Sequence, residues 1–194
     1  MKWQHYILFS ALLSSVTVAS GKSMLQSDLR PDHFRGQFAG NIGFLSLGAG
    51  YSWLNNHVAS DLLVGYVPEQ VGGTKILKLV QKNTVQFNIA EKGFFSKVKP
   101  LTGFSVNFET GRNSYVTPPD KYPAGYYGTN AFTFSFFTGV AYEVPFAKEN
   151  VFSKVHYYAE VGTLATYLYY DFKRREYLNP EIWSLALGLK FTLK

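Results

Sequence analysis

The stretch LTGFSVNFET, residues 101–110, decides the fold class, because its side chains alternate between two kinds. The even positions carry the larger and more apolar side chains: Thr102, Phe104, Val106 and Phe108. The odd positions carry Gly103, Ser105, Asn107 and Glu109. Successive side chains of a β-strand point to opposite faces, so this period of two predicts a strand with one apolar face. The pattern alone leaves open whether that face turns toward a core or toward lipid.

The same alternation recurs along the chain, in segments that end at turn-forming residues. Six further segments show it: residues 43–53, 57–67, 75–87, 130–144, 154–162 and 181–193. Asn55-Asn56, Pro68 and Gly72-Gly73 separate the first three of these segments. Short alternating segments bounded by Asn, Pro and Gly are typical of all-β proteins. We therefore predict an all-β, antiparallel up-and-down β-barrel.

The composition of the two faces indicates which one meets the surroundings. Charged residues make up 16% of the chain, against about 25% in a typical soluble domain, and aromatic residues make up 18%. The less bulky face carries Gly, Ala, Ser and Thr, whereas a water-facing sheet would carry Lys, Glu, Asp and Arg. Such a face suits a narrow, filled barrel interior, and the bulky apolar face then suits lipid. Strands in lipid must close into a barrel so that every backbone group is paired.

The N-terminus has the features of a cleaved secretory signal. A basic start at Lys2 precedes the apolar run ILFSALLSSVTVA, residues 7–19, which is too short to span a bilayer as a helix. Ala19 and Gly21 suit the −3 and −1 positions of a signal peptidase site, and Thr17 with Ala19 is an alternative. We expect residues 1–21 to be a signal peptide and residues 22–194 to form one β-barrel domain.

Charge and side-chain inventory exclude several kinds of site. The chain has no cysteine, which removes disulfides, thiolate metal sites and a cysteine nucleophile. The net charge is +6, but the basic residues are scattered, so we expect no nucleic-acid partner. His33, His57 and His156 are widely spaced and no acidic calcium loop is present, so we expect neither metal nor cofactor.

The C-terminus adds a resemblance to a known class of proteins. ALGLKFTL carries Gly188, then Phe191 and Leu193, with the spacing of the C-terminal insertion signal of bacterial outer-membrane barrels. Together with the leader and the alternating strands, the chain resembles a small, eight-stranded bacterial outer-membrane β-barrel. One departure is Lys194, since many such proteins end on Phe. The resemblance implies residence in the outer membrane, contact with its lipid, recognition of the last strand by the barrel-insertion machinery, and a monomer.

The position of the eighth strand is open at this point. Bacterial barrels have even strand numbers, and about ten residues per membrane strand suits eight strands here. The eighth could be residues 163–172 (TLATYLYYDF), which could also extend the preceding strand or form a short helix. It could instead be residues 34–41 (FRGQFAGN), with Gly40-Asn41 as the turn. We favour the second, because it places the long connection at residues 112–129 outside the cell, where long loops belong.

Charged residues on the inward face of the predicted strands form the candidate site. They are Asp61, Glu109, Glu143, His156, Glu160 and Lys190, with either Lys78 or Lys82 as a further candidate. An eight-stranded barrel is just wide enough for side chains to fill, and isolated buried charges are costly. We therefore expect these side chains to pair across the interior as a polar network that plugs the barrel.

Three functions from different classes remain. The first is a non-enzymatic barrel with a structural or loop-mediated role, in which Tyr122, Tyr126 and Tyr127 of the longest connection are candidate contacts. The second is a lipid-modifying enzyme like the lipid A deacylases and acyltransferases. The third is a soluble, lipocalin-like carrier.

The enzyme alternative finds little support in the sequence. His57 and Ser60 are three residues apart, which places them on opposite faces of a strand, and His156 is followed by two tyrosines. A triad needs its members on one face, so we expect no catalytic residues.

Overall fold

The computed structural model describes residues 30–111, 114–117, 130–147, 151–174 and 179–194. The expected signal peptide and the three loop tyrosines, Tyr122, Tyr126 and Tyr127, lie outside these residues. Residues 31–194 form one compact unit. Among the described residues, no helix is both long enough and apolar enough to cross a bilayer.

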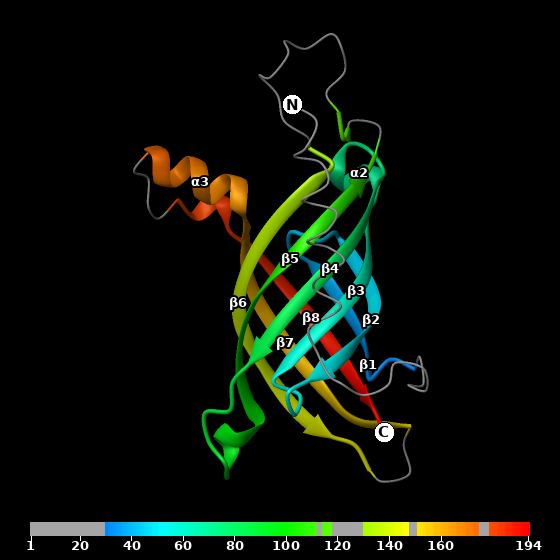
Figure 1. Cartoon of the computed structure of the whole chain (residues 1–194), viewed down its shortest axis with the longest axis vertical. Helices are drawn as coiled ribbons and strands as arrows, with labels where there is room; N and C mark the ends of the chain where they lie inside the picture. Colours follow the sequence, from blue (N-terminus) through cyan, green and yellow to red (C-terminus); the bar gives the residue numbers. More distant parts are fainter. Residues whose placement is uncertain (1–29, 112–113, 118–129, 148–150, 175–178) are drawn as a thin grey trace. The chain divides into compact units, whose positions relative to one another are not determined.

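Eight antiparallel strands close into a barrel in which each strand pairs with its sequence neighbours and β8 pairs with β1 (Figure 1). The strands are β1 (His33–Ala39), β2 (Leu45–Trp53), β3 (Val58–Val67), β4 (Ile76–Gln86), β5 (Val98–Thr110), β6 (Phe132–Pro145), β7 (Phe152–Leu164) and β8 (Ser184–Leu193). This confirms the predicted all-β, eight-stranded, antiparallel barrel. Closure leaves no strand edge unpaired, which removes the usual site of edge-to-edge aggregation.

The eighth strand is β1, which confirms the choice of residues 34–41 over residues 163–172. Its turn into β2 uses left-handed backbone at Ala39 and Gly40, with φ of 60° and 83°. In the competing segment β7 ends at Leu164, and α3 (Ala165–Arg174) follows as a helix. The register explains this: the last residue of β7 that pairs with β8 is Gly162, opposite Ser184. Beyond Gly162 the chain has only β6 as a partner strand. A helix forms its backbone hydrogen bonds within itself and needs no partner strand.

The two longest connections, β5–β6 and β7–β8, lie at the same end of the barrel. The end that holds the C-terminus has the tight β2–β3 turn, where Asn55 and Asn56 adopt φ of 57° and 66°, and the β4–β5 connection with η1 (Phe94–Lys97). The other end carries α2 (Glu69–Gly72), the long β5–β6 connection, α3 and η2 (Pro180–Ile182) (Figure 1). Asparagine tolerates the left-handed region, which is why it suits the tight turn.

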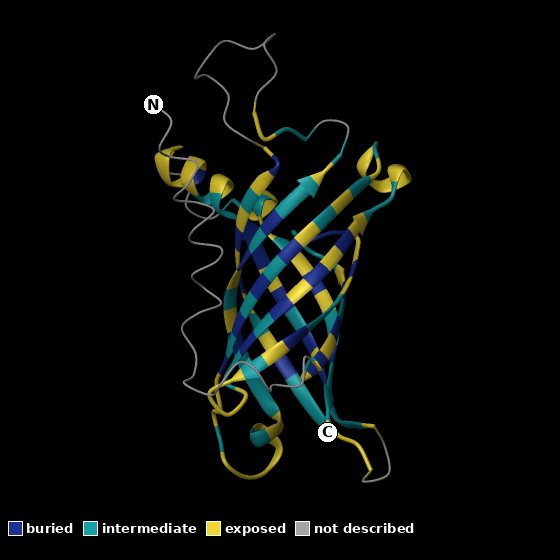
Figure 2. Cartoon of the chain, turned by 45° about the vertical axis from the view of Figure 1, so that its right-hand side comes forward, coloured by how far each residue is buried: buried dark blue, intermediate teal, exposed yellow. Residues whose placement is uncertain are grey.

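Burial alternates residue by residue along the strands (Figure 2). The buried residues include many polar side chains, and the exposed residues include many large apolar ones. In β5, Ser105 and Asn107 have no exposed surface, whereas Phe104 is 44% exposed. Outward Phe136 on β6 and Leu47 on β2 are 50% and 61% exposed. Residues 101–110 therefore turn their apolar face outward and their polar face inward.

Glycines on the inward face make room for the two interior rings. Gly103 lies opposite Phe137, and Gly188 lies opposite Tyr158. A Cβ at Gly103 would meet the backbone oxygen of Asn83 and lie 2.6 Å from Cζ of Phe137. Because a backbone atom cannot move aside cheaply, this position requires glycine.

We expect Gly103→Ala to destabilise the barrel by about 1–3 kcal/mol, the usual cost of overpacking. The matched control is Gly36→Ala on the outward face, where the added Cβ would meet only the mobile end of Leu47 at 3.3 Å. Urea unfolding followed by tryptophan fluorescence measures both. Equal stability losses in the two variants would contradict this explanation.

Candidate functional site

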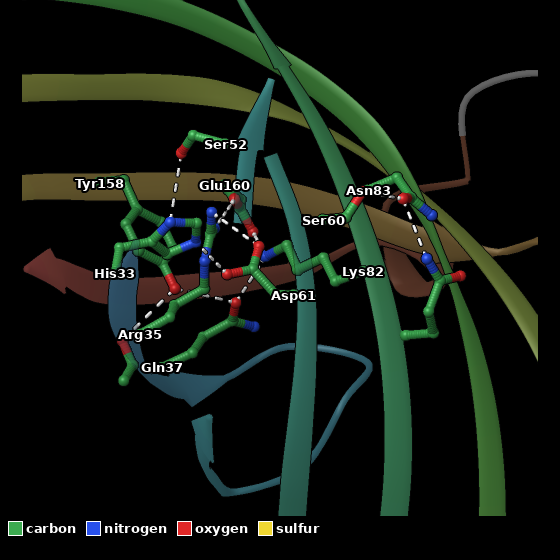
Figure 3. A network of polar contacts seen from close by, with 12 residues as sticks. His33, Arg35, Gln37, Ser52, Ser60, Asp61, Lys82, Asn83, Tyr158 and Glu160 are labelled. Atoms are coloured by element: carbon green, nitrogen blue, oxygen red, sulfur yellow. Dashed lines mark hydrogen bonds and ion pairs between the residues drawn. The ribbon is translucent and has the colours of Figure 1, made fainter. Parts of the chain in front are cut away.

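A cluster of buried charges centred on Asp61 lies inside the barrel (Figure 3). His33 Nε2 lies 2.6 Å from Asp61 Oδ1, and Arg35 Nη2 lies 3.0 Å from Asp61 Oδ2. All three side chains are at most 1% exposed. One carboxylate thus faces a guanidinium and an imidazole away from water, which compensates its charge.

The contact between β1 and β3 passes across β2 at a glycine. His33 lies opposite Gly50, and Gly50 lies opposite Asp61. A Cβ on Gly50 would come within 2.8 Å of both Asp61 Oδ1 and His33 Nε2. The missing side chain of Gly50 therefore lets His33 reach over one strand to Asp61.

A second ion pair, between Lys82 and Glu160, lies beside the first. Lys82 Nζ donates to Glu160 Oε2 at 2.5 Å and to Gln37 Oε1 at 2.7 Å. Arg35 Nη1 is 3.9 Å from Glu160 Oε1, which links the two pairs. The cluster joins two carboxylates, Lys82, Arg35 and a neutral amide, so its charges nearly balance.

Two aromatic rings border the cations. Lys82 Nζ lies 4.3 Å from the centroid of the Phe137 ring, and the Arg35 guanidinium carbon lies 5.1 Å from that of Tyr158. The Tyr158 hydroxyl donates to Gln37 Oε1 at 3.3 Å. Cations gain electrostatic stabilisation over a ring face, and the gain is larger for buried cations such as Lys82 and Arg35 than for exposed ones.

Uncharged polar side chains fill the neighbouring part of the interior. Ser105 Oγ and Ser135 Oγ share a hydrogen bond of 2.6 Å, and Asn107 Nδ2 donates to Ser135 Oγ at 3.2 Å. A cavity of about 20 Å³ lies between this group and the ion cluster, lined in part by Lys82, Glu160 and Ser184. A polar cavity of this size holds about one water molecule. Buried polar side chains therefore line this part of the interior.

The six residues predicted for the network fall in three places. Asp61 and Glu160 belong to the central cluster. Glu109 pairs with Lys78 at 3.1 Å toward the loop end, and Glu143 pairs with Lys154 at 2.9 Å toward the C-terminal end. His156 Nε2 lies 3.6 Å from Glu143 Oε2, and Lys190 is buried in register between His156 and Arg35. The acidic members thus do not form one network.

Sequence reasoning missed four members of the cluster: His33, Arg35, Gln37 and Tyr158. The first three alternate with Phe34 and Phe38 in β1, so the strand predicted there already placed Arg35 and Gln37 opposite the aromatic face. Tyr158 sits on an inward face that otherwise carries charges. The signal for these residues was the period of two itself, applied to every polar residue of every predicted strand, including residues 34–41.

A hydrogen-bonded chain at the C-terminal end of the interior has the connectivity of a catalytic triad (Figure 3). Ser52 Oγ lies 3.3 Å from His33 Nδ1, and His33 Nε2 lies 2.6 Å from Asp61. Acyl transfer also needs donors aimed at an oxyanion. The backbone N–H of Ser52 instead donates to the Asp32 carboxylate at 2.7 Å, whose charge would repel an oxyanion. In the described residues this hydrogen-bonded chain orients His33, and the Ser52 amide is already engaged by Asp32.

The proposed insertion-signal residues lie on the strand that closes the barrel. The Tyr158 ring packs against Gly188. Phe191 lies on the outer face beside Phe152, and their ring centroids are 5.3 Å apart. Leu193 is the last residue of β8 and pairs with Phe152. Within the described part of the chain, no three His, Asp or Glu side chains gather as metal ligands would.

No protein-family model matches the chain, and no curated protein matches it. The barrel and the chemistry of its two faces are therefore the basis for inferring function.

Proposed function

We propose that the protein is a small bacterial outer-membrane barrel, exported through a cleaved N-terminal signal, with a structural or loop-mediated role and no enzymatic activity. One observation carries the proposal: the closed sheet exposes Phe, Leu and Val outside and buries Lys, Arg, Asp and Glu inside. In water, an apolar surface of this extent would promote aggregation. In a bilayer, the same surface meets hydrocarbon and closure satisfies every strand.

The difference between the two ends supports an orientation. Outer-membrane barrels have short periplasmic turns and longer extracellular loops. The end with α3 and the long β5–β6 connection would then face outward from the cell. There α3 exposes Tyr167, Tyr169 and Tyr170, which are 47%, 62% and 50% exposed. These rings are the described candidates for a loop-mediated contact, with outer-membrane lipid the nearest partner.

The filled interior supports a role other than transport. The ion cluster and the rings of Phe137 and Tyr158 occupy the barrel centre, and the cavity beside them holds about one water. A barrel plugged by paired side chains has no continuous aqueous path. We further propose that the barrel-insertion machinery recognises the C-terminal strand through Gly188, Phe191 and Leu193.

Fractionation of cells that express the full chain tests the proposal. We expect the protein in the outer-membrane fraction, shortened by about the length of the signal, and resistant to extraction with urea. Recovery in the soluble periplasmic fraction would contradict membrane residence. Steady ion conductance of the purified barrel in a planar bilayer would contradict the filled interior.

A second candidate function, hydrolysis of an acyl ester, is favoured by the Ser52–His33–Asp61 chain. We expect no such activity, because the amide of Ser52 is engaged by Asp32. Ser52→Ala should therefore leave hydrolysis of a nitrophenyl ester and labelling by a fluorophosphonate at the same background as the unaltered protein. Labelling of the unaltered protein that Ser52→Ala abolishes would establish the second function and overturn the first.

A further inference from the structure

Three polar side chains stand on the outer face, where the neighbouring positions are apolar. Ser60, Gln81 and Asn83 alternate with the buried residues of β3 and β4, so they point out of the barrel. Gln81 is at the centre of the outward row of β4, between exposed Leu79 and Asn83. Figure 3 shows Ser60 and Asn83 set apart from the interior cluster.

These three side chains form one hydrogen-bonded group. Ser60 Oγ and Gln81 Nε2 both donate to Asn83 Oδ1, each at 2.9 Å. Ser60 and Asn83 are cross-strand partners, and Gln81 and Asn83 are two residues apart on one face. We call Ser60, Gln81 and Asn83 the outer amide group.

The outer amide group has hydrogen-bonding capacity left over. Asn83 Nδ2 and Gln81 Oε1 have no side-chain partner among the described residues. If the oxygen and nitrogen positions were exchanged in both amides, Asn83 Oδ1 and Gln81 Nε2 would be the atoms without a side-chain partner. Either way, one donor and one acceptor remain close together on the surface.

This inference rests on the proposed function, in which the outward face of β4 meets hydrocarbon. Polar groups there are costly unless they are paired, and Asn and Gln side chains in membranes pair across protein interfaces. The flanking outward residues are apolar: Leu62 lies opposite Gln81 on β3, and Phe104 and Val106 lie opposite Asn83 and Gln81 on β5. A partner must therefore offer both an amide donor and an amide acceptor within an apolar surface.

We propose that the outer amide group is the centre of a contact between two copies of this chain. A twofold axis brings residue i of one copy to residue j of the other, and the reverse contact follows by symmetry. With Gln81 of one copy opposite Asn83 of its partner, each leftover donor finds a leftover acceptor. The apolar side chains of β3 and β5 surround the pair. This departs from the monomer expected from the sequence, where no signal for association was found.

Single-cysteine cross-linking in membranes tests this contact, since the chain has no cysteine of its own. Val106→Cys places a thiol beside Gln81 on the outer face, and Leu187→Cys places one on the outer face of β8, where Leu187 is exposed. We expect a bismaleimide to cross-link Val106→Cys into a dimer and to leave Leu187→Cys monomeric. Adding Gln81→Leu and Asn83→Val to Val106→Cys should lower the dimer yield about tenfold.

The possible failures are distinguishable. Membrane residence of Val106→Cys with no more dimer than Leu187→Cys would overturn the contact and leave the proposed function standing. Unchanged cross-linking in the variant that lacks both amides would also overturn it. Recovery of all variants in the soluble fraction would overturn the proposed function itself. The boiled and unboiled gel mobility of each variant shows that the barrel has formed.

Discussion

Glu160→Gln is expected to destabilise the barrel by about 3–5 kcal/mol, the cost of removing one partner of a buried ion pair. The substitution keeps the shape of the side chain, so no cavity forms. It removes the counter-charge of Lys82 at 2.5 Å and the nearby charge that faces Arg35. Asp61 would remain as the single carboxylate for two buried cations in the central cluster. Urea unfolding of the barrel in detergent or lipid measures the loss.

The matched control removes both charges of the pair. Replacing a buried pair by apolar side chains of similar volume is often neutral or stabilising. Lys82→Met combined with Glu160→Gln should therefore recover most of the stability lost in Glu160→Gln alone. A double variant as unstable as the single variant would show that shape or hydrogen bonding to Gln37, rather than charge balance, dominates at this position.

Phe136→Arg should destabilise the membrane-inserted barrel by about 2–4 kcal/mol, the cost of Arg at the centre of the lipid face of a barrel. Phe136 is 50% exposed and lies in the middle of the outward row of β6, which runs from Phe132 to Tyr142. In water the same change would cost little, because an exposed ring is exchanged for an exposed charge. Unfolding in lipid vesicles compares the variant with the unaltered protein.

Tyr142→Arg is the control for this prediction. Tyr142 occupies the end of the same outward row, where Arg can reach the headgroups and costs about 0–1 kcal/mol. A loss that depends on depth, large at Phe136 and small at Tyr142, is the signature of a bilayer. Equal effects at both positions would contradict the assignment of this face to lipid.

The strands were predictable because their signal is local. Each segment reports its own two faces through a period of two, and the turns at Gly40 and at Asn55-Asn56 coincide with left-handed backbone. Residues 163–172 were harder, because their tyrosines suit a strand or a helix equally. Whether these residues form a strand or a helix depends on whether β8 is long enough to pair with them, and their own sequence does not contain that information.

The interior contacts were less predictable, because they depend on register between strands that are distant in sequence. His33 meets Asp61 only because Gly50 lies between them in the sheet. Lys82 meets Glu160 across the interior from β4 to β7. The sequence identified Asp61 and Glu160 as inward carboxylates but could not show which cations they face. The outer amide group was hidden for a different reason, since Gln81 and Asn83 read as ordinary polar positions until the inward face was known.

The central claim is that the apolar outer face of the barrel meets lipid. The most direct test compares refolding of residues 22–194 in detergent-free buffer and in lipid vesicles, followed by gel electrophoresis of unboiled and boiled samples. We predict folding only in the presence of lipid, with a mobility difference between the unboiled and the boiled sample. A folded protein that stays soluble without lipid or detergent and shows no such difference would contradict the claim, and would favour a soluble carrier.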